Sequence, residues 1–135
     1  MEHLLRALIV DDAELSRRVL KRVVSEVFEY DEAENGLIAV RKYIESLELG
    51  KPYDIIFMDI VMPELDGKKA VKIIRKIERY LEVEQTPIVM ISASEMLDEI
   101  EELVSGLLRK VVNRQLLNET LRGIFKDRIV QLRCN

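Results

Sequence analysis

The segment IIFMDIVMPELDG, residues 55–67, decides the fold because it joins a strand signature to a helix signature. It begins with four consecutive apolar residues, a run that is typical of a strand buried on both faces of a parallel sheet. The run ends at Asp59, and Asp66 before Gly67 has the features of a helix start. The segment therefore predicts a buried strand that ends on a carboxylate, followed by a loop and a helix.

The same alternation continues along the rest of the chain. Apolar runs at 7–10 and 88–91 repeat the buried-strand signature, and weaker runs occur at 28–33 and 107–112. Apolar residues recur at helical spacing in the segments 15–27, 36–49, 70–81, 95–105 and 114–130. The apolar stripe of the first of these segments consists of Leu15, Val19, Leu20, Val23 and Val27. Five strand–helix units in succession predict an α/β fold with a parallel sheet and helices on both faces.

The length and composition fit one domain over residues 1–135, with a core at about 5–130. A hydrophobic content of 48% excludes a disordered chain, and no apolar run approaches the ~20 residues that span a bilayer. The single cysteine, Cys134, cannot form an internal disulfide, so we expect a cytoplasmic protein without membrane contact. The net charge of -4 argues against a dedicated nucleic-acid binder.

Polar side chains stand where several of the predicted strands end. Asp11 and Asp12 follow the first apolar run, and Asp59 follows the third. Ser92 follows the fourth run, and Lys110 lies in the fifth. Because the carboxyl ends of parallel strands share one edge of the sheet, we expect these side chains to converge there.

Each of these residues also has an ordinary structural interpretation. Asp11, with Glu14 three residues later, or Asp12 could cap the start of the first helix. A lone Ser92 is usually a hydrogen-bonded strand end, and a lone Lys110 is usually an edge residue that reaches solvent. Taken together, however, three converging acids repel one another unless a cation lies among them. Oxygen ligands without His or Cys suit Mg²⁺, and a hydroxyl with an ammonium suits phosphoryl oxygens.

The loop after the first strand excludes the common nucleotide sites. Its sequence, DDAELS at 11–16, contains neither of the glycine patterns that cradle nucleotide phosphates. It is also not the Ser/Thr-rich loop that holds a flavin phosphate. Two acids at this point repel a phosphate until a metal ion is bound.

The same residues resemble, in order and spacing, the receiver domain of two-component response regulators. The motifs that carry the resemblance are Val10-Asp11-Asp12, the stretch MDIVMPELDG at 58–67, Ser92-Ala93 and Lys110. The resemblance extends over essentially the whole chain. It implies a single flavodoxin-like (βα)5 domain with a sheet of order 2-1-3-4-5.

The resemblance also implies a role for each residue of the predicted site. Asp59 matches the aspartate that accepts a phosphoryl group. Mg²⁺ would be held by Asp59, Asp11, Asp12 and the backbone carbonyl of Val61. Of the remaining positions, Ser92 matches the switch hydroxyl, Ala93 the small residue that leaves room for the phosphate, and Lys110 the lysine that bridges the phosphoryl oxygens.

These roles imply a signalling switch and not an enzyme that acts on an external metabolite. Self-phosphorylation and autodephosphorylation are the only reactions we expect. The phosphoryl donor would be a sensor histidine kinase or a histidine phosphotransfer protein, and output would pass to a downstream protein by contact. The acidic segment 95–105 and the basic segment 114–130 could pair within one chain in the resting state, or with a second copy in a symmetric homodimer through the 95–130 face.

Three departures from the family pattern lie around the fifth strand. Val111 stands where receivers usually have a proline, Leu107 replaces the usual aromatic residue, and the stretch from Gly106 to Lys110 is short. These departures keep open a pseudo-receiver that binds a partner without phosphorylation. A phosphatase of the haloacid dehalogenase type would need an acid two residues after the nucleophile, where this chain has Val61.

Overall fold

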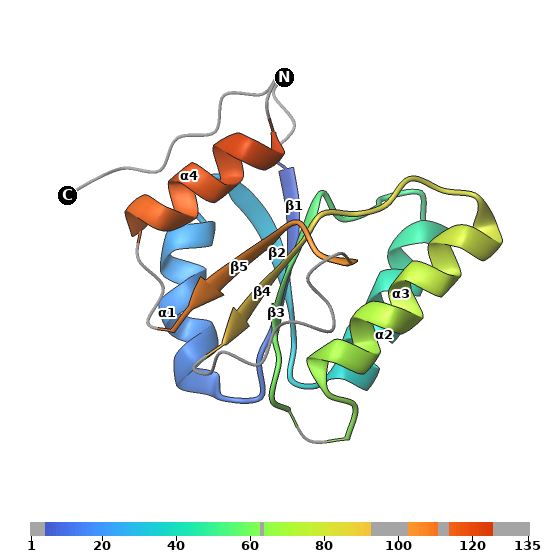
Figure 1. The fold of residues 1–135 in the computed structure, drawn as a ribbon, viewed down its shortest axis with the longest axis horizontal. Coiled ribbons are helices and arrows are strands. Elements are labelled where there is room, and N and C mark those ends of the chain that lie inside the picture. Colours follow the sequence, from blue (N-terminus) through green and yellow to red (C-terminus); the bar gives the residue numbers. More distant parts are fainter. Residues whose placement is uncertain (1–4, 63, 93–102, 111–113, 126–135) are drawn as a thin grey trace.

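A computed structural model describes residues 5–62, 64–92, 103–110 and 114–125 of the chain, and these form one parallel sheet flanked by helices (Figure 1). The strands are β1 (Leu5–Val10), β2 (Phe28–Ala33), β3 (Ile55–Asp59), β4 (Ile88–Ser92) and β5 (Gly106–Arg109). Their spatial order is β2-β1-β3-β4-β5, and each neighbouring pair is parallel. The predicted fold class and strand order are therefore confirmed.

Helices cover both faces of the sheet, as the sequence predicts. The helices in the described residues are α1 (Glu14–Val24), α2 (Gly36–Glu48), α3 (Gly67–Leu81) and α4 (Arg114–Ile124). In Figure 1, α2 and α3 lie on one side of the sheet and α1 and α4 on the other. The helix expected at 95–105 falls largely on 93–102, outside the described residues, and so does the part of the last helix beyond residue 125.

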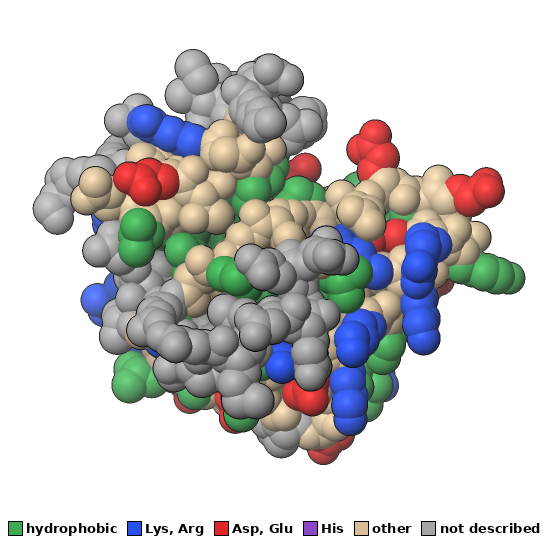
Figure 2. All heavy atoms as spheres, viewed as in Figure 1, with side chains coloured by type: hydrophobic (Ala, Val, Ile, Leu, Met, Phe, Trp, Pro, Cys, Tyr) green, Lys and Arg blue, Asp and Glu red, His purple; other side chains and the backbone are tan. Residues whose placement is uncertain are grey.

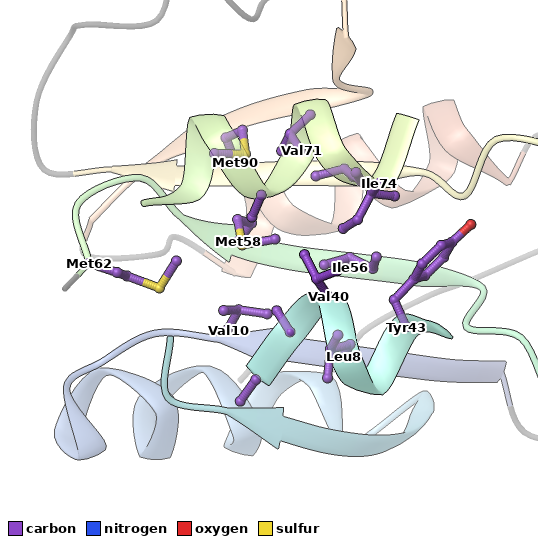
Figure 3. Close-up of a cluster of buried hydrophobic side chains, with 14 of the residues drawn as sticks. Leu8, Val10, Val40, Tyr43, Ile56, Met58, Met62, Val71, Ile74 and Met90 are labelled. Atoms are coloured by element: carbon purple, nitrogen blue, oxygen red, sulfur yellow. The ribbon is translucent and has the colours of Figure 1, made fainter. Parts of the chain in front are cut away.

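Two apolar layers hold the helices against the sheet. Alternate residues of β1 point to opposite faces, so Leu8 packs under α2 and α3 while Ile9 packs under α1 and α4. Figure 3 shows the first layer, in which Tyr43 and Ile74 meet the β3 residue Ile56. Every residue of β3 is buried, which explains its unbroken apolar run. In the part of the chain that the structure covers, no helix combines the length and apolar character needed to cross a bilayer.

Side-chain caps fix the starts of α2 and α3. The Asn35 side chain accepts a hydrogen bond from the Ile38 amide at 2.8 Å. The Asp66 side chain accepts one from the Lys69 amide at 2.9 Å. The cap at Asp66 agrees with the helix start that the sequence predicts. The outer face of α3 is basic, as Figure 2 shows, and its exposed cations are Lys69, Lys72, Lys76 and Arg79.

A buried ion pair ties α3 to the amino ends of β4 and β5. The side chains of Arg75 and Glu78 are 5% and 1% exposed, with Nη1 and Oε1 2.7 Å apart. The Arg75 guanidinium also donates to the carbonyl oxygens of Thr86 and Leu103, each at 2.9 Å. The second Glu78 oxygen accepts from the Tyr43 hydroxyl at 3.0 Å and from the Thr86 amide at 2.7 Å. The network therefore satisfies both buried charges.

We expect Glu78→Gln to be strongly destabilising, because it leaves the Arg75 guanidinium buried without its counter-ion. Breaking one side of a buried pair typically costs about 3–5 kcal/mol of unfolding free energy. The control is Glu45→Gln on the exposed side of α2, for which a change within ~0.5 kcal/mol is expected. Urea unfolding of the three proteins measures the difference, and equal stabilities of the two variants would contradict the structural role given to Glu78.

Candidate functional site

Three carboxylates meet at the carboxyl edge of the sheet. Asp11 and Asp12 directly follow β1, and Asp59 is the last residue of β3, the neighbour of β1. One oxygen from each of the three side chains lies within 4.8 Å of the other two. Asp11 and Asp59 are each only 6% exposed, whereas Asp12 is exposed to solvent. The structure therefore brings together the three acids as the sequence predicts.

The backbone around Asp11 aims one of its carboxylate oxygens into this site. Its amide donates to the Ala33 carbonyl oxygen at 3.1 Å, which extends the contact between β1 and β2 by one residue. Its Oδ1 accepts from the Ala13 amide at 2.9 Å and closes a turn. The N-cap of α1 is Ala13, without a side-chain cap, so the prediction that Asp11 or Asp12 caps this helix is wrong. Asp11 lies two residues too early to cap the helix.

A glycine allows α3 to begin directly against the end of β3. A Cβ atom on Gly67 would lie 2.1 Å from the carbonyl oxygen of Asp59, a distance that no real side chain tolerates. The Gly67 amide donates to the Ile60 carbonyl oxygen at 2.8 Å. This close approach fixes both ends of the loop that follows Asp59.

The Lys110 ammonium lies between two of the three acids. Its Nζ is 2.9 Å from Asp11 Oδ2 and 3.4 Å from Asp59 Oδ2. Lys110 directly follows β5, so its side chain reaches from beyond that strand to the ends of β1 and β3. With the three carboxylates ionised, the Lys110 ammonium offsets only part of the negative charge that the described residues bring to the site.

The environment shifts the pKa values of Asp59 and Lys110. Burial raises the pKa of Asp59 to about 6, with a further contribution from the Asp11 carboxylate and opposition from Lys110. Burial alone would lower the pKa of Lys110, but its contacts with Asp11 and Asp59 reverse that effect and leave the pKa above its usual value. At neutral pH, Lys110 is therefore charged and Asp59 is largely ionised.

The donor set of the site fits a hard divalent cation. Three carboxylates supply oxygen ligands only, and their negative charge exceeds that of the one ammonium beside them. Mg²⁺ takes oxygen ligands, is bound through few carboxylates and retains several waters. Asp11, Asp12 and Asp59 are the residues that can hold it.

The other predicted site residues are described only in part. Ser92 ends β4 in register with Arg109 of β5, but its side chain lies outside the described residues, as does the whole of Ala93. Val61 lies in the loop after β3 with its residue surface 71% exposed. The roles of Ser92, Ala93 and the Val61 carbonyl therefore stay predictions.

An apolar cavity of about 190 Å³ adjoins the acids, and sequence reasoning missed it. Asp59 and Lys110 line it on one side, and Leu15, Ser16 and Val19 of α1 line it on the other. Leu15 and Val19 belong to the predicted apolar stripe of α1 but are 69% and 42% exposed. The core is reached instead by Leu20, Val23 and Val24. Helical spacing indicates an apolar face but does not show how far the core extends along it.

Residues 7–124 match the family model of the response regulator receiver domain. The chain belongs to this family. The receiver domain is 38% identical over 131 residues to the histidine kinase CKI1 of Arabidopsis thaliana, an alignment that covers 84% of this chain and 11% of CKI1. It is 51% identical over 69 residues to the chemotaxis protein CheY of Listeria monocytogenes, covering 50% of this chain and 54% of CheY. The chain thus spans only part of the length of these relatives.

Solved structures agree with this assignment. The receiver domain of CKI1 in complex with Mg²⁺ and BeF3⁻ has a TM-score of 0.78 and 33% identity, with 90% of both chains covered. The Ssk1 receiver domain of Saccharomyces cerevisiae, crystallised with the histidine phosphotransfer protein Ypd1, has a TM-score of 0.77 and 25% identity, with 93% of both chains covered. Receiver domains are signalling switches and not classical enzymes.

The raised pKa of Asp59 predicts a pH-dependent stability in the absence of metal. The folded pKa of about 6 lies above the ordinary value of 3.8, so ionisation of Asp59 opposes folding. This penalty is absent below about pH 4 and complete above about pH 6, where it amounts to something on the order of 2–3 kcal/mol. The unfolding free energy of the wild type relative to Asp59→Asn should therefore fall as pH rises through this window. Urea unfolding of both proteins in EDTA at several pH values measures this difference in unfolding free energy. A difference that does not change with pH would contradict the prediction.

A second prediction follows from the position of the Lys110 ammonium, which occupies space beside two of the proposed metal ligands. Lys110→Gln removes this competing cation, so we expect the variant to bind Mg²⁺ several-fold more tightly than the wild type. Lys72→Gln on the exposed face of α3 is the matched control, with no change expected. Amide chemical shifts followed during Mg²⁺ titration give the dissociation constants, and weaker binding by the Lys110 variant would count against the competition.

Proposed function

We propose that this receiver domain is the phosphoryl-accepting switch of a two-component phosphorelay, with Asp59 as the acceptor. The observation that carries the proposal is the position of Asp59, a buried carboxylate at a strand end beside two further acids and the Lys110 ammonium. Such an arrangement concentrates negative charge where a fold would otherwise avoid it. Binding of a dication, followed by a phosphoryl group, would explain why this charge is kept there.

In the proposed reaction, an ionised Asp59 oxygen attacks the phosphorus of a phosphohistidine in line with the bond that breaks. A new O–P bond forms, the N–P bond breaks, and its electron pair stays on the imidazole nitrogen of the donor. Lys110 turns from the carboxylates toward the incoming phosphoryl oxygens and offsets their charge. A pKa of about 6 keeps Asp59 available as a nucleophile at neutral pH but not in acid.

Asp11 and Asp12, together with Asp59 and the carbonyl of Val61, are the proposed ligands for Mg²⁺. When bound, this ion neutralises charge on the phosphoryl oxygens. The solved CKI1 receiver domain, which is similar to this chain, was crystallised with Mg²⁺ and BeF3⁻ and supports this assignment. Ser92 and Ala93 are proposed as the switch hydroxyl and the small residue beside the phosphate.

The exposed apolar surface of α1 supports a phosphoryl donor that is itself a protein. Leu15 and Val19 lie at the rim of the cavity that Asp59 lines, so a partner covering them would present its histidine to the acceptor. The Ssk1 receiver domain was crystallised with a histidine phosphotransfer protein. We propose a protein of that class, or a sensor histidine kinase, as the donor, and a downstream protein as the target. A homodimer through the 95–130 face remains part of the proposal.

The test is phosphorylation of the purified chain by acetyl phosphate with Mg²⁺, read by intact mass. We expect the wild type to gain the mass of one phosphoryl group, and Asp59→Asn or chelation of Mg²⁺ to prevent the gain. Asp31→Asn, which changes an acid of β2 that contacts Tyr53 and Arg6, controls for the loss of a carboxylate elsewhere. A folded wild type that stays unmodified would favour the pseudo-receiver, which binds its partner without phosphorylation.

A further inference from the structure

A second charged cluster lies behind the acidic site and has no part in the function proposed so far. Its centre is Arg17 of α1, whose side chain is only 15% exposed. The Arg17 Nη1 atom donates to the backbone carbonyl oxygen of Asp11 at 2.6 Å. Its Nε atom donates to Glu32 Oε1 at 3.1 Å. One rigid guanidinium thus links the turn after β1 to the end of β2.

The bond from Arg17 completes the restraint of Asp11. The Asp11 amide is bonded to β2 through Ala33, its carbonyl oxygen to Arg17, and its Oδ1 to the Ala13 amide. Only Oδ2 is left to face the site, where it meets Lys110. The direction of Asp11 Oδ2 therefore depends on how firmly the turn after β1 is held. The same turn sets the distance from Asp12, the next residue, to Asp59.

Glu32 in turn holds Arg17 and balances its charge. Its second oxygen lies 3.4 Å from Lys21 Nζ, and its backbone carbonyl oxygen accepts from Lys42. The planar guanidinium reaches the carboxylate and the Asp11 carbonyl at once, which a flexible ammonium does less well. The Glu32 carboxylate also neutralises a cation that would otherwise oppose the binding of a dication nearby.

We infer that Arg17 is a positioning residue for the metal-binding acids, that it acts through the backbone of Asp11, and that Glu32 fixes it in place. The inference rests on the proposed function only in taking Mg²⁺ as the ligand. Residues that orient metal ligands from behind typically change metal affinity by 10- to 100-fold when removed.

If Arg17 positions Asp11, Arg17→Ala changes the affinity for Mg²⁺ in the opposite direction from that expected if Arg17 acts through its charge alone. Removing a cation near the acids should strengthen Mg²⁺ binding if Arg17 acts only through its charge. Loss of the bond to the Asp11 carbonyl should weaken Mg²⁺ binding if Arg17 holds the turn. The neighbouring Arg18 offers a matched control, because it is 59% exposed and pairs with Glu14 on the same helix. Arg18→Ala removes the same charge without touching Asp11.

The experiment is a Mg²⁺ titration of the full chain, followed by the amide chemical shifts of residues 11–13 and 59–60. We expect Arg17→Ala to weaken Mg²⁺ binding by about 10-fold or more, Arg17→Lys to restore part of the affinity, and Arg18→Ala to leave it unchanged. Thermal unfolding in EDTA establishes that each variant is folded at the titration temperature. Binding by Arg17→Ala that equals or exceeds that of the wild type overturns the inference.

A double-mutant cycle tests the role given to Glu32. Glu32→Gln should weaken Mg²⁺ binding, and adding it to Arg17→Ala should cause little further loss, because both act through one contact. Additive losses would show that Glu32 acts independently and would overturn that part of the inference. A wild type that binds Mg²⁺ but takes no phosphoryl group from acetyl phosphate would overturn the proposed function alone.

Discussion

Repulsion among three carboxylates is the constraint on which the arrangement of this domain depends. Asp11 and Asp59 end neighbouring strands, so the register of β1 and β3 places their charges together. Lys110, the residue after β5, offsets part of this charge. Its contact with Asp11 depends on the position of β5 at the edge of the sheet next to β4. The described residues of the site keep an excess of negative charge, and this charge favours the binding of a dication.

The domain has two buried charged clusters, one around Glu78 and one around Asp59. The Glu78 cluster stabilises the fold, and the Asp59 cluster differs from it in how well its charges are matched. Glu78 accepts hydrogen bonds from the Arg75 guanidinium, the Tyr43 hydroxyl and the Thr86 amide, so its charge is fully matched. Asp59 lies beside the Asp11 carboxylate, and the Lys110 ammonium is 3.4 Å from its Oδ2. Burial raises the pKa of Asp59, and the Asp11 carboxylate beside it raises the pKa further. The first cluster closes one end of the sheet, and the second leaves the other end open to ligands.

The sequence predicts the parts of this structure that depend on local patterns. Continuous apolar runs locate the buried strands, and acids that follow them locate the site, because both signals follow from the burial of neighbouring residues. Contacts between distant residues are invisible to such patterns. Arg75 and Glu78 have the i, i+3 spacing of an ordinary pair on a helix surface. Nothing in the sequence around Arg17 indicates that its side chain contacts Asp11 and Glu32. The wrong prediction that Asp11 or Asp12 caps α1 has the same origin, and so does the exposure of Leu15, which the apolar stripe of α1 does not indicate.

The short strand β5 connects the site to the surface around it, and its two ends are held differently. At its start, the Leu103 carbonyl oxygen is bonded to Arg75 and the Ser105 amide to Ile88. Along its length, Gly106 lies so close to α4 that a Cβ atom there would approach the Thr120 side chain to 2.8 Å. At its end, Arg109 pairs with Ser92 of β4, and among the described residues Lys110 contacts Asp11 and Asp59 of the site. In the proposed reaction, a phosphoryl group that draws Lys110 away from the acids would act on the carboxyl end of β5, while the contacts at its start keep the strand in register with β4.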